Sequence, residues 1–129
     1  MRMPVLLDTH ILLWLRVAPD RLTGGERRAV DIAPCRYVSA VSLWEIAILV
    51  GLDRIEDDPR LFDLPTGFDL LPVTPTHCRA VVELPQLHRD PFDRMLIAQA
   101  RTDKLLLLTR DNQILAYGRA GAITVEPFR

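Results

Sequence analysis

Short apolar runs alternate with helical segments along the chain, and this alternation constrains the fold more than any other feature. The runs show little polar alternation, which is typical of strands covered on both faces. Strands separated by helices indicate parallel pairing, because parallel neighbours need crossover connections. The sequence therefore predicts an α/β protein, a three-layer α/β/α sandwich around a mostly parallel sheet of four to five strands. The expected strands are residues 4–8, 37–41, 68–73, 105–111 and 122–126, and the expected helices are 9–17, 23–33, 42–51, 74–84, a segment within 88–100, and 112–118.

We expect residues 1–129 to form a single domain, because a chain of this length buries about two-thirds of its unfolded surface. No apolar run is long enough to span a membrane and no signal pattern opens the chain, so we expect a soluble, cytoplasmic protein with no membrane association. The net charge of −1 argues against a protein that coats nucleic acid indiscriminately. Cys35 and Cys78 are far apart, and we expect two buried or half-buried free thiols.

Two aspartates follow expected strands. Asp8 ends the first apolar run, and Asp111 comes just past the fourth. In open α/β sheets, ligands bind beyond the carboxyl ends of the strands, so both positions are suited to a functional site. Each aspartate could equally be the N-cap of the helix that follows it.

Glu45 is the only charged residue in the segment SLWEIAILV. Ser42 and Glu45 have capping-box spacing, which contributes on the order of 1 kcal/mol. The segment is apolar on almost every face, so we expect it to be largely covered. Burying an unpaired carboxylate costs several kcal/mol unless a cation or hydrogen-bond donors offset this cost. A capping box does not clearly repay such a cost, whereas a metal ion would.

The stretch HRDPFDRMLIAQA carries Asp90 and Asp93. Asp90 as N-cap, Pro91 at the first helical position and an acid two residues later are typical of a helix start. Asp93 lies nearer the body of the helix, and the N-terminus of this helix should face the ends of the strands.

Asp8, Glu45, Asp93 and Asp111 could therefore meet at one edge of the sheet. Four convergent carboxylates repel each other and require hard divalent cations, and an all-oxygen ligand set points to Mg²⁺ or Mn²⁺. The residues alone leave a second interpretation open, in which the four acids are independent helix caps.

The same residues carry a resemblance to the PIN-domain family, and within it to the VapC ribonuclease toxins of type II toxin–antitoxin systems. The matching motifs are LLDTHILLWL, SAVSLWEIAI, HRDPFDRMLIAQA and LLTRD, in this order and over nearly the whole chain. The resemblance places core acids on Asp8, Glu45, Asp93 and Asp111. It also implies auxiliary roles for Asp90 and for Thr109, which would hydrogen-bond within the site.

This resemblance implies a Mg²⁺- or Mn²⁺-dependent endoribonuclease that hydrolyses RNA phosphodiester bonds. Asp8 and Asp93 would be the principal metal ligands, completed by Glu45 and Asp111. It further implies a homodimer and a cognate antitoxin protein as partner. Trp14 and Trp44 fit either a core or an interface. The alternative function is a catalytically inactive PIN-like binding module, whose signature would be the loss of a core acid.

Overall fold

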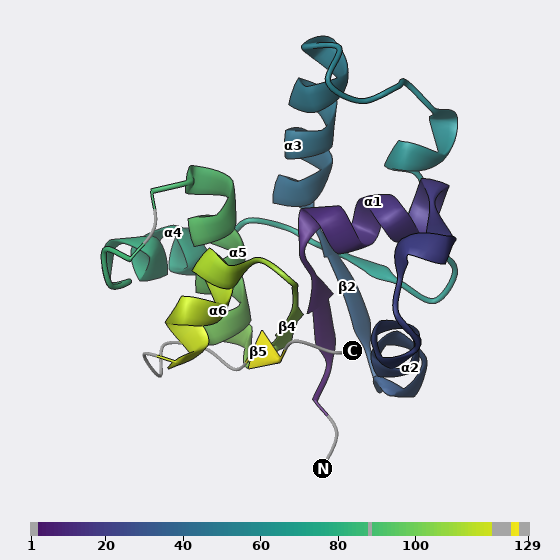
Figure 1. The fold of residues 1–129 in the computed structure, drawn as a ribbon. Helices are drawn as coiled ribbons and strands as arrows, with labels where there is room; N and C mark the ends of the chain where they lie inside the picture. Colours follow the sequence, from purple (N-terminus) through teal and green to yellow (C-terminus); the bar gives the residue numbers. More distant parts are fainter. Residues whose placement is uncertain (1–2, 88, 120–124, 127–129) are drawn as a thin grey trace.

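The computed structural model describes residues 3–87, 89–119 and 125–126 of the chain. A five-stranded sheet with the strand order β3-β2-β1-β4-β5 forms its centre (Figure 1). All neighbouring strands are parallel, which confirms the predicted α/β fold class. Residues 122–124 of the last expected strand lie outside the described residues. The strands are β1 (Val5–Leu7), β2 (Arg36–Ser39), β3 (Asp69–Leu71), β4 (Leu106–Leu108) and β5 (Val125–Glu126).

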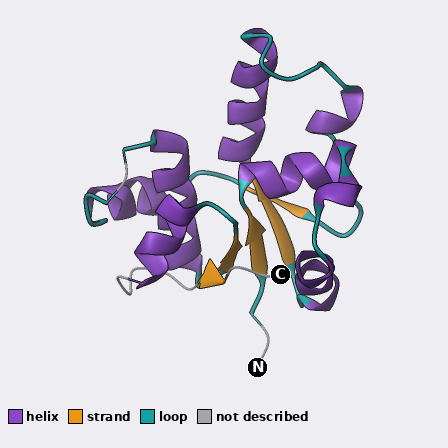
Figure 2. Ribbon diagram, viewed as in Figure 1, coloured by secondary structure: helices purple, strands orange, loops and turns teal. Residues whose placement is uncertain are grey.

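Helices cover both faces of the sheet, as Figure 2 shows. On one face lie α1 and α2, and on the other lie α4, α5 and α6, while α3 continues from β2 beyond the carboxyl ends of the strands. The helix predicted to end at Gly118 runs on to Arg119. The α-helices are α1 (Thr9–Val17), α2 (Gly24–Ile32), α3 (Ala40–Gly51), α4 (Pro75–Val82), α5 (Pro91–Asp103) and α6 (Asn112–Arg119), and two 3₁₀ helices are η1 (Pro19–Arg21) and η2 (Pro59–Phe62).

Strand β1 shows why the sequence produces three layers. Its side chains point alternately to the two faces, and all three are fully buried. Val5 and Leu7 pack in the core formed with α1, α2 and α3. Leu6 packs in the second core, formed with α5 and α6. An unbroken apolar run is therefore what a central strand of this sheet needs.

Helix α3 begins earlier than its capping-box spacing predicted. The N-cap is Ser39, whose hydroxyl accepts a hydrogen bond from the backbone N–H of Val41. The predicted Ser42–Glu45 capping box is therefore wrong. Ser42 lies inside the first turn, and its hydroxyl oxygen accepts from the Thr9 hydroxyl at 3.0 Å.

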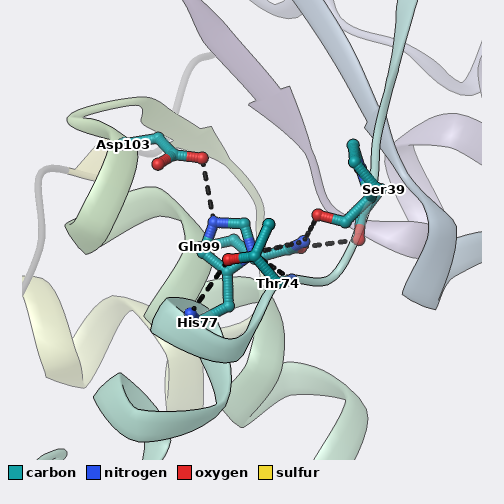
Figure 3. A network of polar contacts seen from close by, with 6 residues as sticks. Ser39, Thr74, His77, Gln99 and Asp103 are labelled. Carbon is teal, nitrogen blue, oxygen red and sulfur yellow. Dashed lines mark hydrogen bonds and ion pairs between the residues drawn. The ribbon is translucent and has the colours of Figure 1, made fainter.

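A buried polar network explains why Ser39 is the cap (Figure 3). The Ser39 hydroxyl donates to Oε1 of Gln99 at 2.6 Å. The His77 ring lies on the other side of Gln99, with Nδ1 accepting from the backbone N–H of Thr74 and Nε2 at 2.9 Å from Asp103. The network ties the start of α3 to α4 and α5, so tertiary contacts select this serine over Ser42.

The two cysteines differ from expectation. Cys35 and Cys78 are free thiols, as predicted, but both are exposed rather than buried or half-buried. Cys35 precedes β2 in a turn, and Cys78 lies on the outer face of α4, where apolar packing is not required. Among the helices that the structure describes, none has the length and apolar character that crossing a membrane requires.

Candidate active site

Asp8 is the buried acid at the carboxyl end of β1. It occupies the N-cap position of α1, yet its side chain makes no capping hydrogen bond. Its carboxylate instead accepts from the Thr109 hydroxyl at 2.7 Å, and only 3% of the residue is exposed. Burial raises the pKa of the Asp8 carboxyl, and the hydrogen bond from Thr109 offsets part of this increase. The Asp8 side chain therefore does not act as a helix cap.

Thr109 and Asp111 follow β4 and complete one side of the site. The Thr109 hydroxyl, which donates to Asp8, also accepts from the backbone N–H of Asp111 at 3.0 Å. The Asp111 carboxylate accepts from the backbone N–H of Gln113 at 2.8 Å, so it caps α6. Its charge contributes to the raised pKa of Asp8, which shows that these two acids lie near each other. The predicted hydrogen-bonding position of Thr109 is thus observed.

Glu45 projects from α3 toward the same acids. Its Oε1 atom is buried and has no hydrogen-bond partner within the described residues. Burial raises the pKa of the Glu45 carboxyl, the nearby Thr9 hydroxyl lowers it, and the charges of Asp90 and Asp8 raise it further. A half-buried carboxylate that leaves one oxygen without a partner and lies near two other acids is unfavourable in the isolated chain.

Asp90 and Asp93 have different environments at the start of α5. Asp90 is the N-cap, and its Oδ1 accepts from the backbone N–H groups of Phe92 and Asp93 at 2.9 and 3.1 Å. Asp93 is only 8% exposed and lies in the first turn of the helix, two residues after Pro91. An edge-to-face contact between Trp44 and Phe92, with ring centroids 5.1 Å apart, holds α3 against this end of α5.

The structure brings Asp8 near Asp111 and brings Glu45 near both Asp8 and Asp90. It does not draw three or more of these acids, or any other such set of His, Cys, Asp and Glu side chains in the described ranges, close enough to hold a metal ion. The chemical type of the ligand atoms nevertheless suits a hard cation. All are carboxylate oxygens, and the unpartnered Glu45 oxygen and the desolvated Asp8 carboxylate are groups that a cation would neutralise.

A cavity of about 190 Å³ opens beside Asp8 and Asp111. His10, Trp14 and Arg110 contribute to its walls. The Arg110 guanidinium stacks over the Trp14 ring, 4.3 Å from its centroid.

An ion pair with Glu26 holds Arg110 in this position. Glu26 is 1% exposed, and burial raises the pKa of its carboxyl, but the hydrogen bonds from Arg110 and Thr23 and the charge of Arg110 together bring the pKa below its ordinary value. Glu26 also forms a capping box with Thr23 at the start of α2. No local spacing could reveal a partner 84 residues away.

Known proteins resemble this chain over almost its full length. A sequence model described as "PIN domain" matches residues 5–120. Ribonuclease VapC22 of Mycobacterium tuberculosis is 29% identical over 126 residues, which cover 94% of this chain and 97% of that protein. The predicted resemblance to PIN-domain and VapC proteins is therefore confirmed.

Solved structures of low sequence identity share the fold. VapBC2 from Rickettsia felis, bound to a DNA fragment from its promoter, matches with a TM-score of 0.74 at 14% identity, covering 98% of this chain and 100% of that one. VapC20 of Mycobacterium tuberculosis, described as a sarcin-ricin loop cleaving toxin, matches with a TM-score of 0.66 at 20% identity, covering 95% and 99%.

Proposed function

Because the chain belongs to the PIN domain family, we propose that it is a metal-dependent endoribonuclease that acts as the toxin of a toxin–antitoxin pair. The observation that carries the proposal is the buried Asp8 carboxylate, which is held by Thr109 and is not used as a helix cap. End-to-end similarity to a protein named as a ribonuclease supports the same activity. The substrate is RNA, and we place the site of action in the cytoplasm, where RNA is abundant.

Asp8, Glu45, Asp93 and Asp111 would hold Mg²⁺ or Mn²⁺ at the carboxyl edge of the sheet. The bound ion would lower the pKa of a coordinated water and neutralise charge on the scissile phosphate. The residues themselves orient the donors. Thr109 fixes the rotamer of Asp8, and Asp90 fixes the first turn of α5, which carries Asp93. Asp90 and Thr109 are thus auxiliary residues.

The partner we propose is a small cognate antitoxin protein. Structural neighbours include VapBC proteins from Rickettsia felis and Salmonella typhimurium, both bound to DNA, and a toxin–antitoxin complex from Klebsiella pneumoniae. The acidic cluster would suit a cationic side chain from this partner, which would block the site by occupying the place of the metal.

We also propose a homodimer, formed through the apolar surface around Trp44. This side chain is 63% exposed on α3, and it borders a largely apolar cavity of about 640 Å³ together with Phe92 and Met95 of α5. Covering so large an exposed aromatic group is favourable, so a second copy is the natural occupant.

The test is cleavage of a mixed RNA pool by the purified chain, free of antitoxin, with Mg²⁺, with Mn²⁺ or with EDTA. The matched variants are Asp8→Asn and Asp93→Asn, which keep the shape of the side chain and remove its charge. We expect metal-dependent cuts, with both variants at least 100-fold slower and still folded by circular dichroism.

Turnover like that of the wild type in both variants would refute the assignment. Failure of the folded wild-type chain to cut any RNA, together with retained RNA binding, would favour the alternative of an inactive PIN-like binding module.

A further inference from the structure

A second cavity adjoins the acidic one. Its volume is about 550 Å³, and it lies between α1, the end of α3 and η2, on the side where Figure 1 shows α3 projecting from the sheet. His10 and Trp14 line both cavities, so the two are neighbours. We call the larger one the α1–η2 pocket. An occupant of this pocket lies beside the candidate active site.

The walls of the α1–η2 pocket combine a flat aromatic ring with aliphatic side chains. Trp14 provides the ring, and Leu13, Ile55 and Leu61 add aliphatic surface. A volume of this size is within the range of small-molecule sites and can hold one nucleotide. Every nucleobase has a π face, so an indole and aliphatic wall accepts bases of any sequence.

The rim of the pocket is cationic. Arg21, Arg54 and Arg60 face two acids, Glu56 and Asp58, which leaves one cation in excess.

These arginines differ in their availability. Arg60 is bound to Asp58 at 2.6 Å, whereas the exposed Arg54 guanidinium makes no ion pair or hydrogen bond within the described part of the chain. Arg110 covers the Trp14 ring from the side of the acidic cavity, whereas the exposed Arg21 lies over the ring at the α1–η2 pocket, 5.9 Å from its centroid, so a base on that face would displace Arg21. A free guanidinium beside an aromatic wall is a phosphate contact next to a base-stacking surface.

We propose that the α1–η2 pocket binds a nucleotide adjacent to the scissile phosphate of a single-stranded RNA, with its base against Trp14 and its phosphate at Arg54. This inference rests on the proposed nuclease function and names a subsite for its substrate. The base must be unpaired, because a stacked and paired base cannot lie flat against the ring. The pocket therefore selects unpaired segments or loops rather than continuous duplex.

The chain contains two tryptophans, which permits a direct spectroscopic test. In a Trp44→Phe background, Trp14 is the only tryptophan, and in a Trp14→Phe background only Trp44 remains. The probe is a degenerate 8-nucleotide single-stranded RNA in EDTA, which prevents metal-dependent cleavage. We expect saturable quenching of Trp14 fluorescence and little change in Trp44, and a blunt duplex RNA should quench Trp14 at least 10-fold less effectively.

Affinity measurements separate stacking from charge. Trp14→Ala should weaken binding roughly 5- to 100-fold, since base stacking on an aromatic side chain is worth about 1–3 kcal/mol. Arg54→Ala should reduce the slope of log affinity against log salt by about 0.7, corresponding to one phosphate contact on a single strand. The matched control is Arg101→Ala, an exposed arginine on α5 that does not line the pocket, and it should leave the slope unchanged.

The outcomes distinguish the subsite from the nuclease function. Unresponsive Trp14 fluorescence, or equal salt slopes for Arg54→Ala and Arg101→Ala, overturns the subsite even if Asp93-dependent cleavage is observed. Quenching by RNA without cleavage supports the subsite and refutes the nuclease. If the antitoxin quenches Trp14 fluorescence and RNA does not, the pocket belongs to the protein partner and the proposal is overturned. If Trp14→Ala fails to fold, the fluorescence of Trp14 in the Trp44→Phe chain and the salt slope of Arg54→Ala still test the subsite.

Discussion

Glu45 carries a carboxylate on a helix that is otherwise apolar, and one of its oxygens is buried without a hydrogen-bond partner in the described chain. Asp8 is more deeply buried but receives the Thr109 hydroxyl. These two acids make the metal-free site electrostatically unfavourable. The cation proposed for this site would offset that cost.

Neutralising Glu45 should stabilise the metal-free protein. Burial raises the pKa of this carboxyl, so the folded chain holds a proton at pH values where the unfolded chain has released it. The free energy of unfolding in EDTA must then fall as pH rises from the usual carboxyl pKa through the raised one. Glu45→Gln should flatten this decline and add about 1 kcal/mol at neutral pH, measured by urea unfolding from pH 4 to 8.

The control for this experiment is Glu56→Gln, which changes an exposed glutamate. It should leave stability within about 0.5 kcal/mol at every pH. A loss of stability in Glu45→Gln at neutral pH would mean that the carboxylate makes favourable interactions in the isolated chain.

The sequence located the candidate acids but not how each side chain is used. Asp8 and Asp111 occupy equivalent positions after parallel strands, yet only Asp111 caps its helix. The difference depends on the Thr109 hydroxyl, which comes from the far end of the chain. Local spacing contains no information about such a contact, nor about the pairing of Glu26 with Arg110.

At the scale of elements, the central strands were easier to predict than the start of α3, where the strand expected over residues 37–41 runs two residues into the helix. A central strand such as β1 needs an unbroken apolar run, and that run is visible in the sequence. The start of α3 is ambiguous because Ser39 and Ser42 are both good caps. Ser39 is selected as the cap because its hydroxyl hydrogen-bonds to the side chain of Gln99 on α5.

Removing each serine hydroxyl in turn should show which of the two contributes more to the free energy of unfolding. Ser39→Ala loses the cap on α3 and leaves the Gln99 carbonyl without its donor, so we expect a loss of about 2 kcal/mol. Ser42→Ala loses one hydrogen bond from Thr9 and should cost about 1 kcal/mol. Urea unfolding followed by circular dichroism measures both. An equal or larger loss for Ser42→Ala would place the effective cap at Ser42.

At the scale of the whole molecule, the exposed face of α3 supports the proposed homodimer. Helix α3 was expected to be largely covered, but Trp44 and Ile48 on this helix are 63% and 36% exposed in the single chain. The question left open from the sequence, core or interface, is thus answered differently for the two tryptophans. Trp14 lines a cavity beside the acids, and Trp44 lies on the outer surface.

The proposed dimer predicts that a charge on this face will prevent association. Trp44→Glu should convert the dimer to a monomer, because burying an unpaired carboxylate in an apolar contact costs several kcal/mol. Leu52→Glu is the matched control, equally exposed but outside the cavity that Trp44 borders. Sedimentation equilibrium measures both. A wild-type monomer at all concentrations, or a dimeric Trp44→Glu chain, would contradict the prediction.

The strand order has a consequence for how the protein is made. Strand β1 sits at the centre of the sheet, but its neighbour β4 is synthesised only after β2 and β3. Asp8 and Thr109 are 101 residues apart, so Asp8 gains this partner only after β4 has been made. A nascent chain that has not reached β4 cannot bring these two residues together, so the proposed activity would begin only after that point of translation.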